Sequence, residues 1–307
     1  MGVDIIATKF SELLTVRSYY SNIGLWPMQP RDINPEGWLS NFTDENDLEI
    51  AAALLDSFIY FNEVQTKKLF ESAFHAISSE IEMSRKSESE IGSAWREFKS
   101  SVIITYPSGF DADVAASGRK FIREARQTLK IDESRLFDPG DVAREVLHQQ
   151  GVTDLVFVDD ISITGHQFLN CCFRNVEVDG MMTSLEELIR EEVLREVYYL
   201  PTVCTAMAKR NISHELPNVR VRPAHLLVDR YFANPPYENT ALVPDELVAG
   251  LDEFLRKYAK RAGYDESKPY GFGNLGLALG FEHSVPDNTL PIFWSENDRW
   301  IPLRRRS

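Results

Sequence analysis

The sequence predicts an α/β protein with a Rossmann-like, mainly parallel sheet and a helical N-terminal portion. Residues up to about 98 carry mainly helical patterns, and from Ser101 onward short apolar runs alternate with helical segments. Such alternation favours parallel strands joined by right-handed crossovers. One apolar run ends in two aspartates and a small polar loop, and ligands of such sheets bind beyond the carboxyl ends of the strands. The expected domains are residues 1–98, mainly helical, and residues 99–307, the α/β domain.

The N-terminal portion is expected to contain two main helices. Thr43 is a good N-cap residue for the stretch TDENDLEIAAALLDSFIYF, and the acidic residues after it suit the positive end of a helix dipole. Apolar residues then recur at helical spacing: Leu48, Ala51, Ala52, Leu55, Phe58 and Ile59. A second helix is expected from Val64 to Ile81.

The α/β portion is expected to begin with a buried strand, SVIITYP, which ends in a tight loop at Pro107, Ser108 and Gly109. The further expected strands are LVFV, REVYYLPTVCTA, VRVRPAHLLV and the last strand-like pieces, GLALGFEHSV and LPIFW. The expected helices are DADVAASGRKFIREARQTL, Pro139 to about His148, the segment from Phe168 to Phe173, SLEELIREEV, AMAKRNISHEL, and Pro244 to about Arg261. Ser184 and Glu187 form a capping box at the start of SLEELIREEV.

Composition and charge exclude several classes of protein. The formal net charge of −14, from 33 basic and 47 acidic residues, disfavours passive binding of a phosphate backbone, so no direct nucleic-acid binding is expected. No run reaches the roughly 18 apolar residues of a membrane-spanning helix, and no signal peptide is visible, which favours a cytoplasmic protein without a membrane partner. The three cysteines lack C-x-x-C spacing, as expected for a reduced protein without a disulfide framework or a zinc site.

The stretch LVFVDDISITGHQ, residues 155–167, is the strongest functional signal in the sequence. Two adjacent carboxylates, Asp159 and Asp160, could each accept a hydrogen bond from one hydroxyl of a ribose diol. The loop that follows leads into a helix N-terminus, which favours a phosphate, while Thr164 adds a hydroxyl donor and Gly165 lets the backbone come close. This pattern predicts a receptor for ribose 5-phosphate. The alternative is that the two acids only cap a strand and turn the chain.

LVFVDDISITGHQ also resembles the signature of type I phosphoribosyltransferases. The resemblance implies that Asp159 and Asp160 are the catalytic acids, which hold the ribose 2′- and 3′-hydroxyls. It implies Mg²⁺ as the cofactor, bound mainly through the diphosphate of phosphoribosyl pyrophosphate (PRPP), with the two aspartates as its candidate protein ligands. It also implies a 5′-phosphate loop made of Ile161, Ser162, Ile163, Thr164, Gly165, His166 and Gln167.

Three positions of this loop depart from the usual pattern of the family. An aliphatic residue usually stands at the position of Ser162, a small residue at that of Ile163, and a small hydroxylic residue at that of Gln167. Together with WLSNFTDENDLEIAAALLDSF and HSVPDNTLPIFW, the motif resembles the phosphoribosyltransferase-like proteins of bacterial defence or conflict operons, the PRTase-CE-like branch. This second resemblance implies a role in antiviral defence and a partner protein from the same operon.

Other candidate site residues have two readings each. Ser108 and Gly109 end the first strand, where the family places its pyrophosphate loop, but they could equally form a plain turn. His166 could donate to the phosphate or point to solvent. The aromatic residues of Pro291–Trp294 could stack on a base, although core packing is favoured.

Two functions follow from these expectations. The first is a Mg²⁺-dependent transferase or hydrolase that acts on PRPP or a nucleotide, as the effector of a defence system. The second is a non-catalytic subunit that senses a nucleotide or serves as a scaffold, and so regulates a partner protein. The intact Asp159–Asp160 pair favours the first function, or a ligand-binding version of the second. The departures at Ser162, Ile163 and Gln167 favour the second. So does the lack of a recognisable hood, the mobile segment with which related enzymes cover the reacting sugar.

Overall fold

The computed structural model describes residues 15–16, 19, 33–83, 87–108, 116–149, 153–234 and 240–306. The protein has the predicted α/β fold with a parallel main sheet. The chain divides into two compact units, Thr66–Val228 and a second unit made of Met1–Gln65 and Asp229–Ser307. This division differs from the predicted boundary between residues 98 and 99, because the second unit is built from both ends of the chain.

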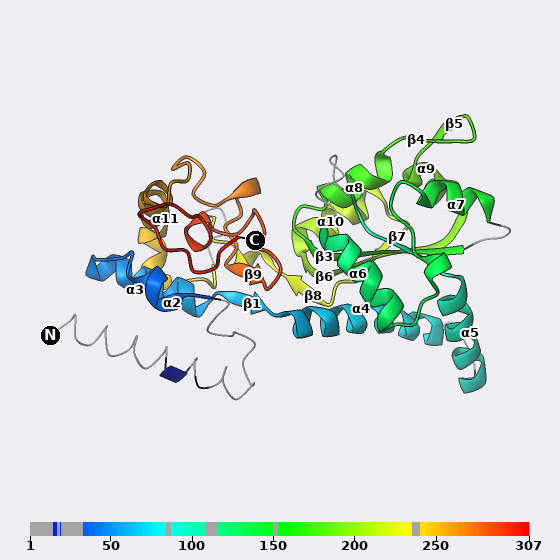
Figure 1. Ribbon diagram of the computed structural model, residues 1–307, viewed down its shortest axis with the longest axis horizontal. Helices are drawn as coiled ribbons and strands as arrows, with labels where there is room; N and C mark the ends of the chain where they lie inside the picture. The colour runs from blue at the N-terminus through cyan, green and yellow to red at the C-terminus, as the bar shows by residue number, and fades with distance from the viewer. Residues whose placement is uncertain are drawn as a thin grey trace. The chain divides into compact units, whose positions relative to one another are not determined.

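The main sheet lies in the unit Thr66–Val228 (Figure 1). Its strands pair in the order β2-β3-β6-β7, and β8 also pairs with β6. All these pairs are parallel. The strands are β2 (Ile103–Thr105), β3 (Thr153–Ser162), β6 (Leu194–Thr205), β7 (Val219–Val221) and β8 (His225–Leu227). The stretch VRVRPAHLLV, expected as one strand, forms two short ones, because Pro223 lies between them and cannot donate a ladder hydrogen bond.

Helices cover both faces of this sheet, which explains why nearly every residue of β3 is buried. Alternate residues of β3 face opposite layers. Leu155 and Phe157 pack with one layer of helices, and Val156 and Val158 pack with the other. The first layer comprises α7 (Val142–His148), α8 (His166–Phe173), α9 (Leu185–Arg190) and α10 (Ala206–Glu215). The second layer comprises α4 (Glu63–Met83), α5 (Glu88–Ser101) and α6 (Ala116–Gln127).

The other unit is built around an aromatic core. Trp38 stacks on Phe293 with ring centroids 5.1 Å apart, and Phe42 packs edge-on against Tyr258 at 4.7 Å. Its parallel pair of strands, β1 and β9, joins segments far apart in the sequence. The elements are α2 (Pro35–Leu39), α3 (Glu45–Asp56), β1 (Ile59–Phe61), η3 (Asp229–Tyr231), α11 (Asp245–Arg261), η4 (Phe272–Asn274), β9 (Leu279–Phe281) and η5 (Pro291–Phe293).

Several sequence predictions are confirmed. The helix expected over Val64 to Ile81 is α4, and REVYYLPTVCTA contains β6. The Ser184–Glu187 capping box is present at the start of α9. Apart from these predictions, the structure has all three cysteines free and buried. Among the described residues no helix is long and apolar enough to cross a membrane.

The first helix is not bounded as predicted. Asp44 rather than Thr43 caps α3, because its side chain accepts hydrogen bonds from the N–H groups of Asn46 and Asp47 at 3.0 and 3.4 Å. The helix ends at Asp56, and the Ser57 hydroxyl donates back to its last turn. Phe58 and Ile59 are therefore not helical.

The C-terminal strand predictions are wrong in part. LPIFW is not a strand, because Pro291 begins the short 3₁₀ helix η5, although Ile292 and Phe293 are fully buried as the core-packing interpretation requires. Only Leu279–Phe281 of GLALGFEHSV is a strand, and it pairs with β1 outside the main sheet. The helix expected from Pro139 begins three residues later, at Val142. The helix DADVAASGRKFIREARQTL is α6 from Ala116, and its predicted start lies outside the described residues.

Three short elements of the unit Thr66–Val228 were not expected. Val176–Val178 and Met181–Thr183 form an antiparallel hairpin, β4 and β5, and Glu133–Arg135 forms a 3₁₀ turn, η2. The hairpin turns at Asp179 and Gly180, with φ angles of 52° and 82°. Two positive φ angles at an Asp-Gly pair are the requirement of a tight two-residue hairpin turn.

Candidate functional site at the carboxyl edge of the sheet

The two aspartates stand near the carboxyl end of β3 and are almost inaccessible, with exposed fractions of 4% for Asp159 and 7% for Asp160. Because side chains alternate along a strand, Asp159 lies on the face of α8 and Asp160 on the opposite face. One Asp159 carboxylate oxygen accepts the Asp160 N–H at 2.9 Å, and the other accepts the Tyr199 hydroxyl at 2.8 Å. Asp160 accepts the N–H of Ile161 at 2.8 Å. The pair therefore also holds the end of its own strand.

The charge of Asp159 is unfavourable where it stands. Burial, and then the neighbouring charge of Asp160, raise the pKa of Asp159 well above its usual range, although the hydrogen bond from Tyr199 acts in the opposite direction. No arginine or lysine forms an ion pair with Asp159 within the described part of the chain. Burial and the nearby Asp159 charge also raise the pKa of Tyr199. Asp159 consequently holds a proton more tightly than an ordinary aspartate.

The predicted phosphate loop is a tight connection between β3 and α8. Gly165 has a φ angle of +80°, and a Cβ atom there would lie 2.9 Å from Ile212 Cγ1, so glycine is required for both backbone and packing reasons. The His166 N–H at the start of α8 donates to Thr164 Oγ1 at 3.4 Å. The loop is held from the end of β6 and from α10. The Thr205 hydroxyl donates to the Ile163 carbonyl, and Asn211 Nδ2 donates to the Thr164 carbonyl at 3.0 Å.

The structure brings the end of β2 next to this loop. Gln167 Nε2 donates to the Pro107 carbonyl at 3.3 Å. Arg174 donates twice to Ser108, from Nη1 to the hydroxyl at 3.2 Å and from Nη2 to the carbonyl at 3.3 Å. Ser108 Oγ also lies 3.9 Å from Cys171 Sγ. Ser108 and the phosphate loop are therefore neighbours, while Gly109, the other residue predicted for the pyrophosphate loop, lies outside the described residues.

The positions that depart from the phosphoribosyltransferase pattern have structural environments of their own. Ser162 and Ile163 are buried, with 5% and 8% of their surface exposed, whereas Ile161 and Thr164 are half-buried. Gln167 is exposed yet fastens α8 to the end of β2. The side chain of His166 is exposed, which agrees with its solvent-facing alternative.

Several residues that shape the site were not predicted from the sequence. Tyr199, Thr205 and Asn211 come from β6 and α10, and Arg174 follows α8. Local motifs do not mark them, since each acts on a segment far away in the chain. The signal that could have found Tyr199 is the parallel register, which places Phe157 of β3 beside it.

The donor atoms at this edge suit Mg²⁺ only together with a ligand. Within the described ranges no three His, Cys, Asp or Glu side chains gather into a group that could hold a metal ion. Mg²⁺ in nucleotide sites is bound through one or two carboxylates, with substrate phosphates and water supplying the other oxygens. Asp159 and Asp160 match that donor type and number.

The sequence matches a known protein family over most of its length. A family model described as PRTase-CE matches residues 35–306, which is most of the chain. No curated protein matches the sequence.

Proposed function

Because the chain belongs to the PRTase-CE family, a phosphoribosyltransferase-like family, we propose that it binds PRPP or another ribose 5-phosphate nucleotide at the carboxyl edge of its main sheet. The observation that supports this most is the convergence of three parts at one edge. The acidic pair of β3, the Thr164–Gly165 loop and Ser108 after β2 are adjacent. Carboxylates suit a ribose diol, and a loop that opens a helix suits a phosphate.

In the proposed binding mode each part of the edge has a separate task. Asp159 and Asp160 accept the ribose hydroxyls, and the N–H groups of residues 161–167, with the Thr164 hydroxyl, hold the 5′-phosphate. Ser108 receives the diphosphate. Mg²⁺, when bound with the ligand, neutralises the charge that develops on the leaving diphosphate. The chain itself positions the sugar and excludes water around C1′, where an oxocarbenium-like state would form.

The proposed biological role is that of an effector in a bacterial antiviral defence system, which transfers or hydrolyses a glycosyl bond of PRPP or a nucleotide. The membership of the PRTase-CE family supports this role, because the resemblance of its sequence blocks to defence-operon proteins extends over the same residues. A partner protein from the same operon is part of the proposal.

A specific observation favours the second candidate function, a non-catalytic subunit that senses a nucleotide or serves as a scaffold for a partner. Both oxygens of Asp159 accept hydrogen bonds from within the protein, and only 4% of its surface is exposed. An acid so engaged holds the strand end whether or not a reaction takes place. The same phosphate loop would then serve recognition alone.

Calorimetry with PRPP, a nucleoside monophosphate and the free nucleoside, each with and without Mg²⁺, tests the binding proposal. We expect both phosphorylated ligands to bind more tightly than the nucleoside. Assay of released diphosphate and free base under the same conditions separates the enzyme from the sensor, since the sensor binds without turnover. Absent binding, or equal binding of all three ligands, would overturn the binding proposal, and with it the enzyme and the nucleotide sensor, and would leave only the scaffold version of the second function.

A further inference from the structure

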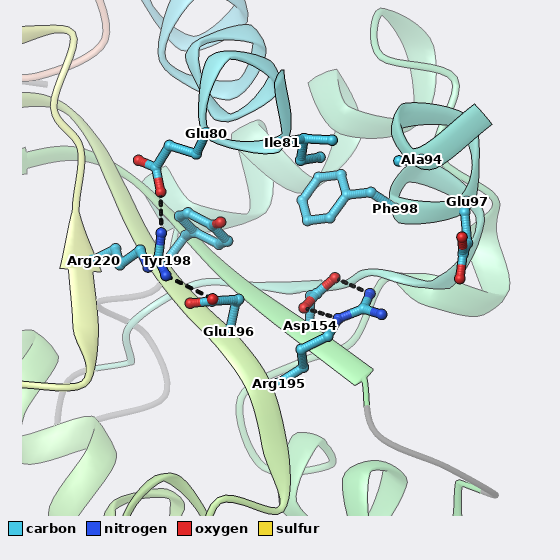
Figure 2. A pocket seen from close by; sticks show the side chains of 10 residues that line it. All are labelled: Glu80, Ile81, Ala94, Glu97, Phe98, Asp154, Arg195, Glu196, Tyr198 and Arg220. Atoms are coloured by element: carbon cyan, nitrogen blue, oxygen red, sulfur yellow. Dashed lines mark hydrogen bonds and ion pairs between the residues drawn. The ribbon is translucent and has the colours of Figure 1, made fainter. Parts of the chain in front are cut away.

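A polar hollow lies at the amino-terminal end of the main sheet, opposite the edge that carries Asp159 and Asp160 (Figure 2). It has a volume of about 240 Å³ and is lined by residues from α4, α5, β3, β6 and β7. The lining residues that matter here are Glu80, Phe98, Asp154, Arg195, Tyr198 and Arg220. At roughly 30 Å³ for each water molecule, the hollow has room for about eight waters. This is the size of one long side chain and is too small for a nucleotide.

Tyr198 is the feature that distinguishes this hollow from an ordinary surface groove. Only 3% of the residue is exposed, and its hydroxyl makes no hydrogen bond with any described residue. Figure 2 shows the hydroxyl directed into the hollow, towards the side of Phe98. Burial, and then the charge of Glu80, raise the pKa of Tyr198 to about 12, so the hydroxyl is protonated at neutral pH. The hydroxyl is not among the fully buried polar atoms that lack a partner, so it is open to the hollow, and a ligand with a polar group there could form a hydrogen bond with it.

The charges around the hollow indicate the sign of such a ligand. Two guanidinium groups line the hollow, those of Arg195 and Arg220. Four carboxylates line it as well: Glu80, Glu97, Asp154 and Glu196. Arg195 holds Asp154 through two hydrogen bonds, and Arg220 bridges Glu80 and Glu196. Arg222, which does not line the hollow, also pairs with Glu80, so four carboxylates stand against three guanidinium groups. The carboxylate of Glu97 has no hydrogen-bond or ion-pair partner in the part of the chain that the structure describes. The surplus charge is negative, so an anion would be repelled and a cation attracted.

Apolar and aromatic groups complete the lining. Ile81 and Ala94 contribute aliphatic surface, and the ring of Phe98 packs edge-on against that of Tyr198 with centroids 6.2 Å apart. An aromatic ring attracts a cation over its face, and aliphatic surface packs against a methylene chain. We propose that this hollow binds a guanidinium or primary amine carried on an apolar stem, with its N–H groups donating to the Tyr198 hydroxyl and the Glu97 carboxylate.

Two sources share this chemistry, a free organic cation and an arginine or lysine side chain of a partner protein. Calorimetry with N-acetyl-arginine amide, against the uncharged isostere N-acetyl-citrulline amide, tests the chemistry itself. We expect the cation to bind about tenfold more tightly, because it gains a hydrogen bond to a charged group. Agmatine and a capped Ala-Arg-Ala peptide then separate the sources: tighter binding of agmatine supports a free cation, and tighter binding of the peptide supports a protein partner.

Two variants locate the binding in this hollow. Tyr198→Phe and Glu97→Gln should each weaken binding of the arginine derivative severalfold, with unchanged melting temperatures. Glu88→Gln is the matched control, because Glu88 is exposed on the same helix, α5, and does not line the hollow. Equal binding of the arginine and citrulline derivatives, no binding of either, or binding that both variants leave unchanged would overturn the proposal. PRPP is proposed to bind at the other end of the sheet. Failure of PRPP binding would therefore count against the proposed function and not against the cation site in the hollow.

Discussion

The two ends of strand β3 carry acids in opposite electrostatic states. At the amino end, Asp154 is buried but receives two hydrogen bonds from Arg195, at 2.9 and 2.5 Å. Glu80 lies at the same end. Burial disfavours its charge, yet the hydrogen bonds and charges of Arg220 and Arg222 prevail and lower its pKa. At the carboxyl end, Asp159 is equally buried, no cation pairs with it among the described residues, and its pKa is raised.

This difference separates acids whose charge stabilises the folded state from acids whose charge destabilises it. When a paired carboxylate at the amino end is buried on folding, charge-assisted hydrogen bonds from arginine replace its hydrogen bonds to water. Asp159 at the carboxyl end bears the cost of burial and of the neighbouring Asp160 charge, which a ligand or a proton can relieve. Strongly perturbed pKa values cluster at functional sites, which is why the carboxyl edge carries the proposed ligand site.

Replacing Asp154 by alanine should have the largest effect on stability. The change removes two hydrogen bonds from Arg195, a half-exposed side chain whose charge water can still solvate, and should cost about 2.5 kcal/mol. Urea unfolding at neutral pH measures the loss. Glu133→Ala, which removes the exposed pair with Arg126, is the matched control and should cost about 0.5 kcal/mol. Equal effects of the two variants would show that the amino end is not held by its ion pairs.

Gly165→Ala should lower the free energy of unfolding by about 2 kcal/mol, because the φ angle is positive and the new Cβ would contact Ile212. Gly180→Ala is the control, because Gly180 has nearly the same φ, +82°, but a methyl group added there would meet no atom within 4 Å. We expect about 1 kcal/mol for Gly180→Ala, from the backbone alone. Thermal or urea unfolding compares the two. A smaller loss at Gly165 than at Gly180 would contradict the tight packing of the phosphate loop against α10.

Tyr198 and Tyr199 are neighbours on β6 with opposite surroundings, and their phenylalanine variants sharpen the comparison. Tyr199→Phe removes the donor to Asp159 and should lower the free energy of unfolding by about 1 kcal/mol. Tyr198→Phe removes a hydroxyl that makes no hydrogen bond with the described residues, and should leave stability unchanged or slightly raised. Urea unfolding of both variants provides the measurement. A greater loss for Tyr198→Phe would refute this assignment.

The pH dependence of stability should have opposite signs at the two ends. The raised pKa of Asp159 means that the folded state binds its proton more tightly, so its contribution is present at low pH and is lost as pH rises towards the folded pKa. The lowered pKa of Glu80 gives a contribution that is present at neutral pH and is lost as pH falls.

Urea unfolding of wild type, Asp159→Asn and Glu80→Gln between about pH 3 and about pH 8 measures both contributions, since the Glu80 contribution is lost at acidic pH. The difference between wild type and Asp159→Asn should fall with rising pH, by up to roughly 1.4 kcal/mol per pH unit. The difference for Glu80→Gln should fall with decreasing pH. Slopes of the same sign would contradict the contrast between the two ends.

The fold was predictable where local patterns decide it. Strands β3 and β6, the helix α4 and the Ser184 capping box all follow from periodicity or from neighbouring residues. The pairing of β1 with β9 could not be predicted, because residues 59–61 and 279–281 meet only in the folded chain. The hairpin of β4 and β5 did have a local signal, the Asp179–Gly180 pair, which periodicity alone did not reveal.

The site was predictable in its position more than in its contacts. The motif indicates an acidic strand end followed by a loop and a helix, and the structure has this order. The hydroxyl of Tyr199 on Asp159, and the guanidinium of Arg174 on Ser108, depend on register and helix packing. No sequence motif predicts the hollow at the amino end, since residues of five separate elements line it. The roles of Asp159 and Asp160 in ligand binding stay predictions.

Ligand-induced stabilisation of the Asp159→Asn/Asp160→Asn double variant tests those roles. Without ligand, the variant should melt at or slightly above the wild-type temperature, because two repelling charges are removed. A ribose 5-phosphate ligand at about 100 times its dissociation constant should stabilise the wild type by about 2.7 kcal/mol. The variant should lose most of this gain, since two charge-assisted hydrogen bonds are worth roughly 1.5–3 kcal/mol each. A double variant that keeps the full gain with the same ligand would show that these aspartates do not hold the sugar.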